Sequence, residues 1–357
     1  MAPHPLLSRC APVLAAIAAS AERTDVEGVH RSQLDGLALA GLLGAWAPPE
    51  LGGGGAPDPV VRELIEGLAA ASGAVWFVAA QHRSPAEVAL RSPNEEVRGR
   101  WALPLASGRA LGAVALAHLR RPGSPAVVAV PDGSGWRVSG RLDWVTSWGL
   151  ADALLLMAET EGGDVVQALV PAVERPGLAV TGRLPLVAMG ATATVGMRLE
   201  AMWVGANEVA RVLPKAEWAA RDAERTANAS PASFGLARVA ADRLAATAER
   251  RGSAGAADLA AELSERVVAV RRQAYTLVDD VPPAEQVPER VRLRAEALDL
   301  AHRAAVAVVA AEGGRSMILD SPAQRWAREA LFQLVQAQTG PLREELLDRW
   351  RRQVDLP

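Results

Sequence analysis

The sequence predicts an α+β protein that is mostly helical, with helices in both terminal parts of the chain and strands in the middle. Pairs of a capping residue and a proline, which start helices, recur within residues 58–93 and again from residue 230. Between them, residues 112–200 carry short apolar runs separated by Gly, Pro and Asp-Gly turns, a pattern typical of strands. After Gly205 the chain becomes rich in Ala, Arg, Glu and Leu. We therefore expect a helical domain at 1–111, a β domain at 112–205 and a helical domain at 206–357.

Composition and charge are those of an ordinary globular protein. Of the 357 residues, 50% are apolar and 22% are charged, and the net charge is −3. This charge, without any dense basic run, excludes an electrostatic basis for nucleic-acid binding. Cys10 is the single cysteine, so intrachain disulfides and cysteine-based metal clusters are excluded, and a cytoplasmic location is expected. No apolar run reaches the ~18 residues of a membrane span, and residues 9–21 favour a helix over a cleaved signal.

Five pairs of a capping residue and a proline predict where helices begin. The side-chain oxygen of the first residue caps free N–H groups, and proline fits the first helical position because its missing N–H is not needed there. The predicted helices lie near 59–80, 85–91, 93–106, 231–251 and 322–338. The pairs are Asp58-Pro59, Ser84-Pro85, Ser92-Pro93, Ser230-Pro231 and Ser321-Pro322.

Residues 135–152 alternate apolar and polar positions and predict two short antiparallel strands that turn at Ser139 and Gly140. Further strands are expected at 126–130, 153–158 and 165–170. Within this stretch, Trp144 stands beside Thr146 and Ser147. A flat apolar face next to two hydroxyls suits a planar heteroaromatic ring that is stacked and hydrogen-bonded at its edge. A core tryptophan flanked by surface hydroxyls is the alternative interpretation.

Residues 139–147, with the sequence SGRLDWVTS, resemble the N-G-x-K-x-W-I-T-N turn of acyl-CoA dehydrogenases. The order of helical, β and helical segments also resembles that family. The resemblance implies an N-terminal helical domain, a central antiparallel β-barrel, a C-terminal four-helix bundle and an FAD cofactor. By the same resemblance, Trp144 packs against the flavin, Thr146 hydrogen-bonds near its reactive nitrogen, and Ser147 lies beside them.

A second segment, residues 118–125, resembles the family's T-E-P-x-A-G-S-D motif over the flavin. By this resemblance Ser124 binds a phosphate or an acyl-CoA group, and His118 lies over the isoalloxazine. A lone histidine in a loop is, alternatively, a solvated or structural residue.

Two further matches imply contacts with the diphosphate of FAD across a subunit interface. Arg251 falls on the arginine of an R-x-x-F-G motif, and Gly313 with Gly314 falls on the glycines of a Q-x-x-G-G motif. The alternative is that Arg251 favours a helix dipole and that the glycines only end a helix. The resemblance therefore implies a homodimer or homotetramer, or a heteromer with a related chain.

The usual catalytic base is missing from its expected positions. Removing the α-proton of an acyl thioester needs a carboxylate beside the flavin. In most family members this glutamate would fall on Ala337 here, and in a second branch on Arg225. Glu224, one residue away, is a weak candidate for the catalytic base.

Three hypotheses follow. The chain is an acyl-CoA dehydrogenase-like flavoprotein that oxidises the CH–CH bond of an acyl-CoA thioester. Alternatively, it is a flavin-dependent monooxygenase of the same fold, which needs no carboxylate base. The third possibility is a partner subunit without a base in a heteromeric acyl-CoA dehydrogenase.

Overall fold

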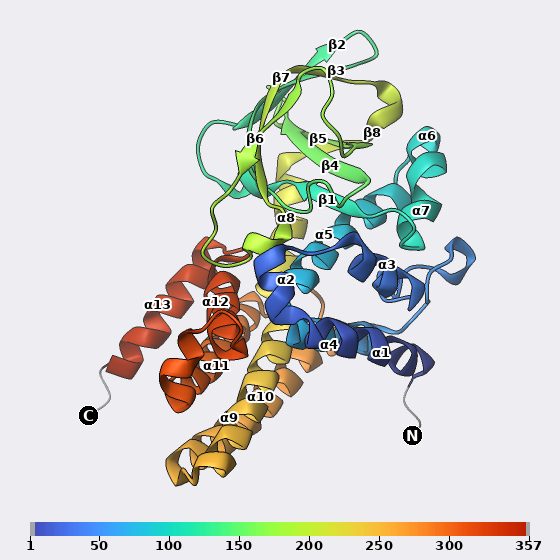
Figure 1. The fold of residues 1–357 in the computed structure, drawn as a ribbon. Helices are drawn as coiled ribbons and strands as arrows, with labels where there is room; N and C mark the ends of the chain where they lie inside the picture. Colours follow the sequence, from blue (N-terminus) through green and yellow to red (C-terminus); the bar gives the residue numbers. More distant parts are fainter. Residues whose placement is uncertain (1–3, 355–357) are drawn as a thin grey trace.

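The computed structural model describes residues 4–354 and places the strands at one end of the molecule and most helices at the other (Figure 1). The N-terminal part is helical, as predicted, and packs α1 against α3 and α4. Its core contains Leu6, Leu34 and Leu64. Among the helices of residues 4–354, none has the length and apolar character that a membrane crossing requires. The N-terminal helices are α1 (Pro5–Ala19), α2 (Ala21–Glu27), α3 (Arg31–Leu39), α4 (Asp58–Ala71), α5 (Gly73–Leu90), α6 (Glu95–Val97) and α7 (Leu103–Ala106).

The central part forms one mixed sheet, so the predicted closed antiparallel β-barrel is wrong. The strand order is β6-β7-β3-β2-β4-β5-β8, with β1 also paired to β4. Strands β6 and β8 end this path within the described residues, and β1 and β2 each pair with β4 in parallel. The sheet does not close because β6 and β8, at the two ends of this path, do not pair with each other among the described residues. Inside the path, β2 meets β4 through Val128 and Glu159 alone. The strands are β1 (Gly112–Ala115), β2 (Val127–Asp132), β3 (Gly135–Val145), β4 (Ala153–Glu159), β5 (Asp164–Pro171), β6 (Leu178–Arg183), β7 (Val195–Val204) and β8 (Val209–Pro214).

The turn predicted at Ser139 and Gly140 is also wrong. Strand β3 runs through both residues and only its register with β7 shifts there, which marks a β-bulge. Gly140 has φ 143°, and a Cβ at this position would lie 2.1 Å from the carbonyl oxygen of Ala126. Only glycine allows this close approach, so the Ser-Gly pair bends the strand instead of reversing it.

The C-terminal part is helical, but it begins later than predicted because β8 follows Gly205 and pairs with β5. Helix α9 packs against α10, α11 and α12, and it also crosses α4. At that crossing a Cβ on Gly235 would lie 2.2 Å from the carbonyl oxygen of Glu66, so the two backbones are in contact. The division into domains after residues 111 and 205 remains a prediction. The C-terminal helices are α8 (Lys215–Ala227), α9 (Pro231–Arg251), α10 (Ala254–Asp280), α11 (Val287–Glu312), α12 (Pro322–Val335) and α13 (Gly340–Val354).

The predicted helix starts have mixed outcomes. Ser230 and Ser321 cap α9 and α12 through hydrogen bonds from the N–H groups two residues later. The start at Ser84 is wrong because α5 continues through Pro85, which lies with His82, Ala86 and Ala89 on the buried face of the helix. Ser92 instead donates to the carbonyl of Ala210, and Asn94 caps the next short helix.

The buried His82 links α5 to the sheet, and we expect the protein to lose stability in acid when this histidine is protonated. Its Nδ1 accepts a hydrogen bond from the Gly112 N–H at 3.1 Å, and burial lowers its pKa to about 4. The folded-state pKa lies below the unfolded value, so this contribution is present above about pH 6.5 and is lost as pH falls toward 4. As pH falls from about 6.5 to 4, the free energy of unfolding measured in urea is expected to decrease by about 3 kcal/mol less in His82→Asn than in the unmodified protein. The exposed His30→Asn is the control, and a His82→Asn profile parallel to that of the unmodified protein contradicts the prediction.

Candidate functional site

A cavity of about 1060 Å³ opens where the sheet meets the helices. The end of β3 provides one wall, α5 and α12 provide a second, and the linker between α8 and α9 provides a third. Apolar side chains on α5 and α12 meet inside it, since Phe77 and Phe332 pack edge to face with ring centroids 4.5 Å apart. The cavity is therefore both large enough and apolar enough to hold a planar ring and an attached chain.

Trp144 lies on the wall of this cavity with 52% of its surface exposed. A β-bulge between Leu142 and Val145 breaks the alternation of β3, so that both of these residues are buried while Trp144 between them is exposed. The indole is therefore not a core side chain. An accessible flat apolar face at a cavity wall is the feature that ring stacking requires.

Thr146 also lines the cavity, and it ends a ladder of three hydroxyls. Its Oγ1 lies 2.8 Å from that of Thr194, which lies 2.9 Å from that of Thr192, and Thr192 donates to the Met189 carbonyl at 2.8 Å. Each hydroxyl has one proton. Because Thr192 donates to a carbonyl, Thr194 donates to Thr192 and Thr146 donates to Thr194. The hydroxyl oxygen of Thr146, which has used its one proton, then faces a ligand as a hydrogen-bond acceptor.

Ser147 is fully buried and does not line the cavity. Its backbone adopts a left-handed conformation at φ 71°, and its N–H donates to the Thr192 carbonyl at 3.0 Å. Its Oγ has no hydrogen-bond partner among the described atoms. Ser147 thus turns the chain at the end of β3 and ties Thr146 to the segment that carries the other threonines.

His118 and Ser124 lie apart from the cavity wall. His118 is buried on the short helix η3 (Ala117–Arg120), and burial lowers its pKa to about 4, so the imidazole is neutral at pH 7. Ser124 is exposed in the loop that follows. Neither lines the cavity, whereas their neighbours Arg120 and Arg121 do.

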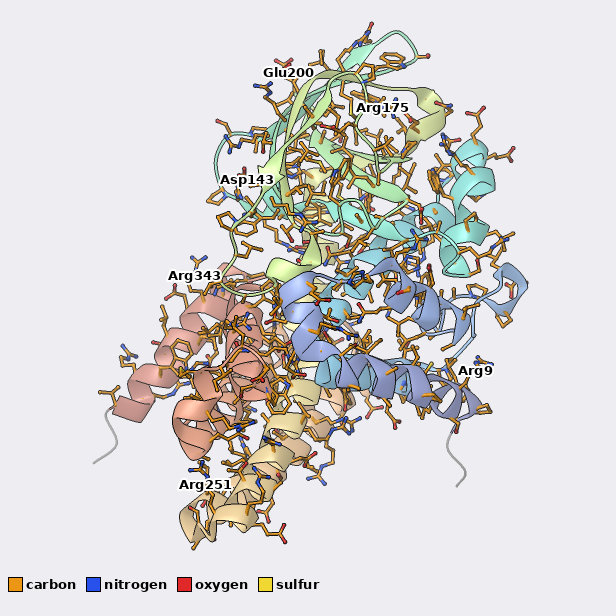
Figure 2. The ribbon with its side chains drawn as sticks, in the orientation of Figure 1. Arg9, Asp143, Arg175, Glu200, Arg251 and Arg343 are labelled. Carbon is orange, nitrogen blue, oxygen red and sulfur yellow. The ribbon has the colours of Figure 1, made fainter. Side chains whose placement is uncertain are left out.

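Arg251, Gly313 and Gly314 come together at a different place, the far end of the helical part. Arg251 donates to the carbonyl of Glu312 at 2.9 Å, and Gly313, with φ 68°, ends α11 beside it. Figure 2 shows Arg251 at the tip of the helices, far from Arg343 near the sheet, and Arg343 lines the cavity. One copy of the chain therefore does not bring these residues to Trp144.

The two positions at which a catalytic carboxylate was sought both line the cavity. Arg225 lies near the end of α8, and Ala337 lies between α12 and α13 with φ 49°. Glu224 is not among the lining residues. Within the described residues, the carboxylates on the cavity wall are Asp58 and Glu87, and Glu87 is paired to Arg83 at 2.8 Å.

A group of arginines around Asp222 was missed by the sequence analysis. Arg120 donates to both carboxylate oxygens of Asp222, at 2.7 and 2.8 Å, and Arg225 donates to one of them at 3.0 Å. Burial raises the pKa of Asp222, but the bonds and charges of the two arginines lower it more, to below its usual value. Arg120 and Asp222 are far apart in sequence, so no local pattern signals the cluster.

Arg294 completes the cluster and joins the end of α8 to the linker between α12 and α13. It is 5% exposed and donates to the carbonyls of Thr226, Gln336 and Ala337. Burial, followed by the charge of Arg120, lowers its pKa to about 10, so it stays charged at pH 7. One guanidinium thus holds the end of α8 and the linker between α12 and α13 together next to the cavity.

Comparison with known proteins shows that the chain has an acyl-CoA dehydrogenase-like fold. No family model matches the sequence. A probable acyl-CoA dehydrogenase of Bacillus subtilis is 26% identical over 193 residues, which is 52% of this chain and about half, 51%, of that protein. The mitochondrial short-chain specific acyl-CoA dehydrogenase of Bos taurus is 24% identical over 335 residues, 85% of this chain and 79% of that protein.

Solved structures share the fold along nearly the whole chain. Butyryl-CoA dehydrogenase from Megasphaera elsdenii superposes with a TM-score of 0.81 at 17% identity and 97% coverage of both chains. A glutaryl-CoA dehydrogenase bound to glutaryl-CoA gives a TM-score of 0.82 at 18% identity, covering 97% of this chain and 95% of that one. KijD3 bound to FMN and a dTDP-amino sugar gives 0.77 at 22% identity, covering 99% and 96%. These likenesses show the fold.

Proposed function

We propose that the chain is a divergent member of the acyl-CoA dehydrogenase family and a flavin-dependent oxidoreductase. The observation that carries the proposal is the half-exposed Trp144 beside the acceptor of Thr146, on one wall of a cavity of about 1060 Å³. A bound flavin supplies reversible two-electron chemistry at this wall. The indole provides a stacking face and the threonine ladder fixes the direction of one hydrogen bond.

Residues outside the cavity favour FAD over FMN as the bound flavin. Arg251 offers guanidinium N–H groups next to the exposed backbone of Gly313 and Gly314, a combination suited to a diphosphate. Because these residues lie far from Trp144 in one copy, we propose that a neighbouring copy supplies them, in a dimer or a tetramer. FMN has no diphosphate, so mass analysis of the extracted cofactor distinguishes the two flavins.

Oxidation of the CH–CH bond of an acyl-CoA thioester is the first candidate reaction, because both curated relatives are acyl-CoA dehydrogenases by name. The apolar wall formed by Phe77 and Phe332 suits an acyl chain. Proton abstraction requires a base, and Glu224 does not line the cavity, so this reaction would need to use Asp58 or Glu87, the two carboxylates on the wall among the described residues.

Flavin-dependent monooxygenation is the second candidate, favoured by the residues at the two expected base positions. A guanidinium at Arg225 and a methyl group at Ala337 cannot accept a proton from carbon. A monooxygenase uses molecular oxygen and reduced flavin and needs no carboxylate there.

The absorbance spectrum of the purified protein tests the proposal. We expect flavin absorbance, either as purified or after incubation with FAD. Anaerobic bleaching by an acyl-CoA selects the dehydrogenase, whereas turnover that requires a flavin reductase and oxygen selects the monooxygenase. A protein that stays colourless with FAD contradicts the proposal, and colour gained only with a related chain indicates a heteromer.

A further inference from the structure

The cavity wall carries more positive than negative charge. It includes Arg120, Arg225, Arg294 and Arg343, whereas Asp58 and Glu87 are the lining carboxylates among the described residues. Arg120 and Arg225 share a single carboxylate, that of Asp222. Arg343 contacts the neutral amide of Gln338 at 3.0 Å. The surplus arginine charges face a cavity, where the dielectric constant is lower than in bulk water. They therefore attract an anionic ligand more strongly there than they would in bulk water.

Arg225 retains donors for a ligand. Of the five N–H groups of a guanidinium, one bonds to Ser84 at 3.1 Å and one to Asp222 at 3.0 Å. The side chain is 52% exposed and lies on the cavity wall, so the remaining N–H groups are accessible. Asp222 and Ser84 hold the guanidinium in one orientation before any ligand arrives, which lowers the entropic cost of binding.

Arg294 adds charge without its own carboxylate partner. It is buried, and its described hydrogen bonds go to backbone carbonyls, which do not neutralise it. A buried cation in this setting is destabilised unless an anion approaches. Arg120 lies on η3, which packs against β3, the strand that carries Trp144. The cationic cluster is thus next to the wall on which we place the flavin.

We propose that Arg225, supported by Arg120 and Arg294, binds a carboxylate at the end of the substrate's acyl group. The inference rests on the proposed function and narrows its substrate class to acyl-CoA thioesters that carry a terminal carboxylate. A guanidinium fork matches the planar carboxylate with two parallel hydrogen bonds. The phosphates of CoA are the competing anions, and the test below separates them from the acyl carboxylate.

Isothermal titration calorimetry with three probes tests the inference without turnover. The probes are glutaryl-CoA, the neutral pentanoyl-CoA with the same number of acyl carbons, and free CoA. We expect the unmodified protein to bind glutaryl-CoA about 10-fold to 100-fold more tightly than pentanoyl-CoA. Arg225→Gln is expected to abolish this preference, and Arg225→Lys to retain part of it, because lysine keeps the charge without the fork.

The matched control is Arg221→Gln, one turn earlier on α8, where Arg221 is exposed and paired with Glu217 at 2.7 Å. It should leave the preference unchanged, and thermal melts should show that each variant is folded. Equal affinity of the unmodified protein for the two thioesters overturns the inference. An equal loss of affinity for all three probes in Arg225→Gln also overturns it, since the arginine then holds a CoA phosphate. If no probe binds, the thioester substrate is wrong and the inference falls with it, while flavin absorbance still tests the remaining proposal.

Discussion

Replacing Arg325 by methionine is expected to lower the free energy of unfolding by about 3–5 kcal/mol. Arg325 is 3% exposed and donates to Glu329 Oε1 at 2.8 Å and to Glu22 at 3.2 Å. The side chain of Glu329 is buried as well, and its other described bond comes from the Gly73 N–H at 3.0 Å. Methionine preserves much of the volume but leaves a buried carboxylate without its cation, and that charge is the source of the cost.

Urea unfolding at two pH values measures the effect and identifies its cause. Burial is the main influence on Glu329 and holds its pKa above the usual value, and removing Arg325 raises that pKa further. At a pH below the unfolded value the carboxyl is protonated in both states, so the loss should be small near pH 4 and large near pH 8. Arg221→Met, at an exposed ion pair, should cost less than about 1 kcal/mol. An equal loss for Arg325→Met at both pH values contradicts the explanation.

The same ion pair supports the cavity. Glu329 joins α12 to Gly73 at the start of α5, and these two helices carry Phe332 and Phe77 on the cavity wall. Arg325 extends the connection to Glu22 on α2. We therefore expect Arg325→Met to weaken ligand binding as well as stability, because the relative position of α5 and α12 depends on this buried pair.

Local sequence signals were sufficient for part of the fold and for part of the site. The caps at Ser230 and Ser321 depend on neighbouring residues only, and both helices begin where predicted. Trp144 and Thr146 were predicted together because both lie in one short motif, and the structure places both on the cavity wall; their contact with a flavin remains a prediction. The prediction failed at Ser84, where the packing of α5 outweighs a local helix-start signal.

Features built from distant residues could not be predicted. Sheet closure depends on which strands pair, and neither β6 nor β8 alone shows that the two do not pair with each other. Asp222 belongs to the site because it accepts hydrogen bonds from Arg120, which lies in another part of the chain. The alternating Ala-Thr run at residues 191–194 was the available signal for the hydroxyl ladder, but only the fold places it against Thr146.

Replacing Trp144 by alanine is expected to weaken flavin binding about tenfold or more while leaving stability nearly unchanged. The indole exposes half of its surface at the cavity wall, so truncation removes little packing from the core. An aromatic pair contributes about 0.5–1.5 kcal/mol beyond the area it buries, and the lost contact area adds to that. Quenching of flavin fluorescence during titration with apoprotein measures the dissociation constant.

Trp203→Ala is the matched control for this prediction. Trp203 lies on β7 of the same sheet and pairs with Arg137, near the end of β3 opposite to Trp144. Similar free energies of unfolding for the two variants would show that the two tryptophans stabilise the protein to a similar extent. We expect only Trp144→Ala to lose flavin affinity. Equal flavin affinity in the two variants would mean that Trp144 does not stack on the ring. The direction of the Thr146 hydrogen bond would then be the remaining argument for a flavin at this wall, because it depends on Thr192 and Met189 and not on the indole.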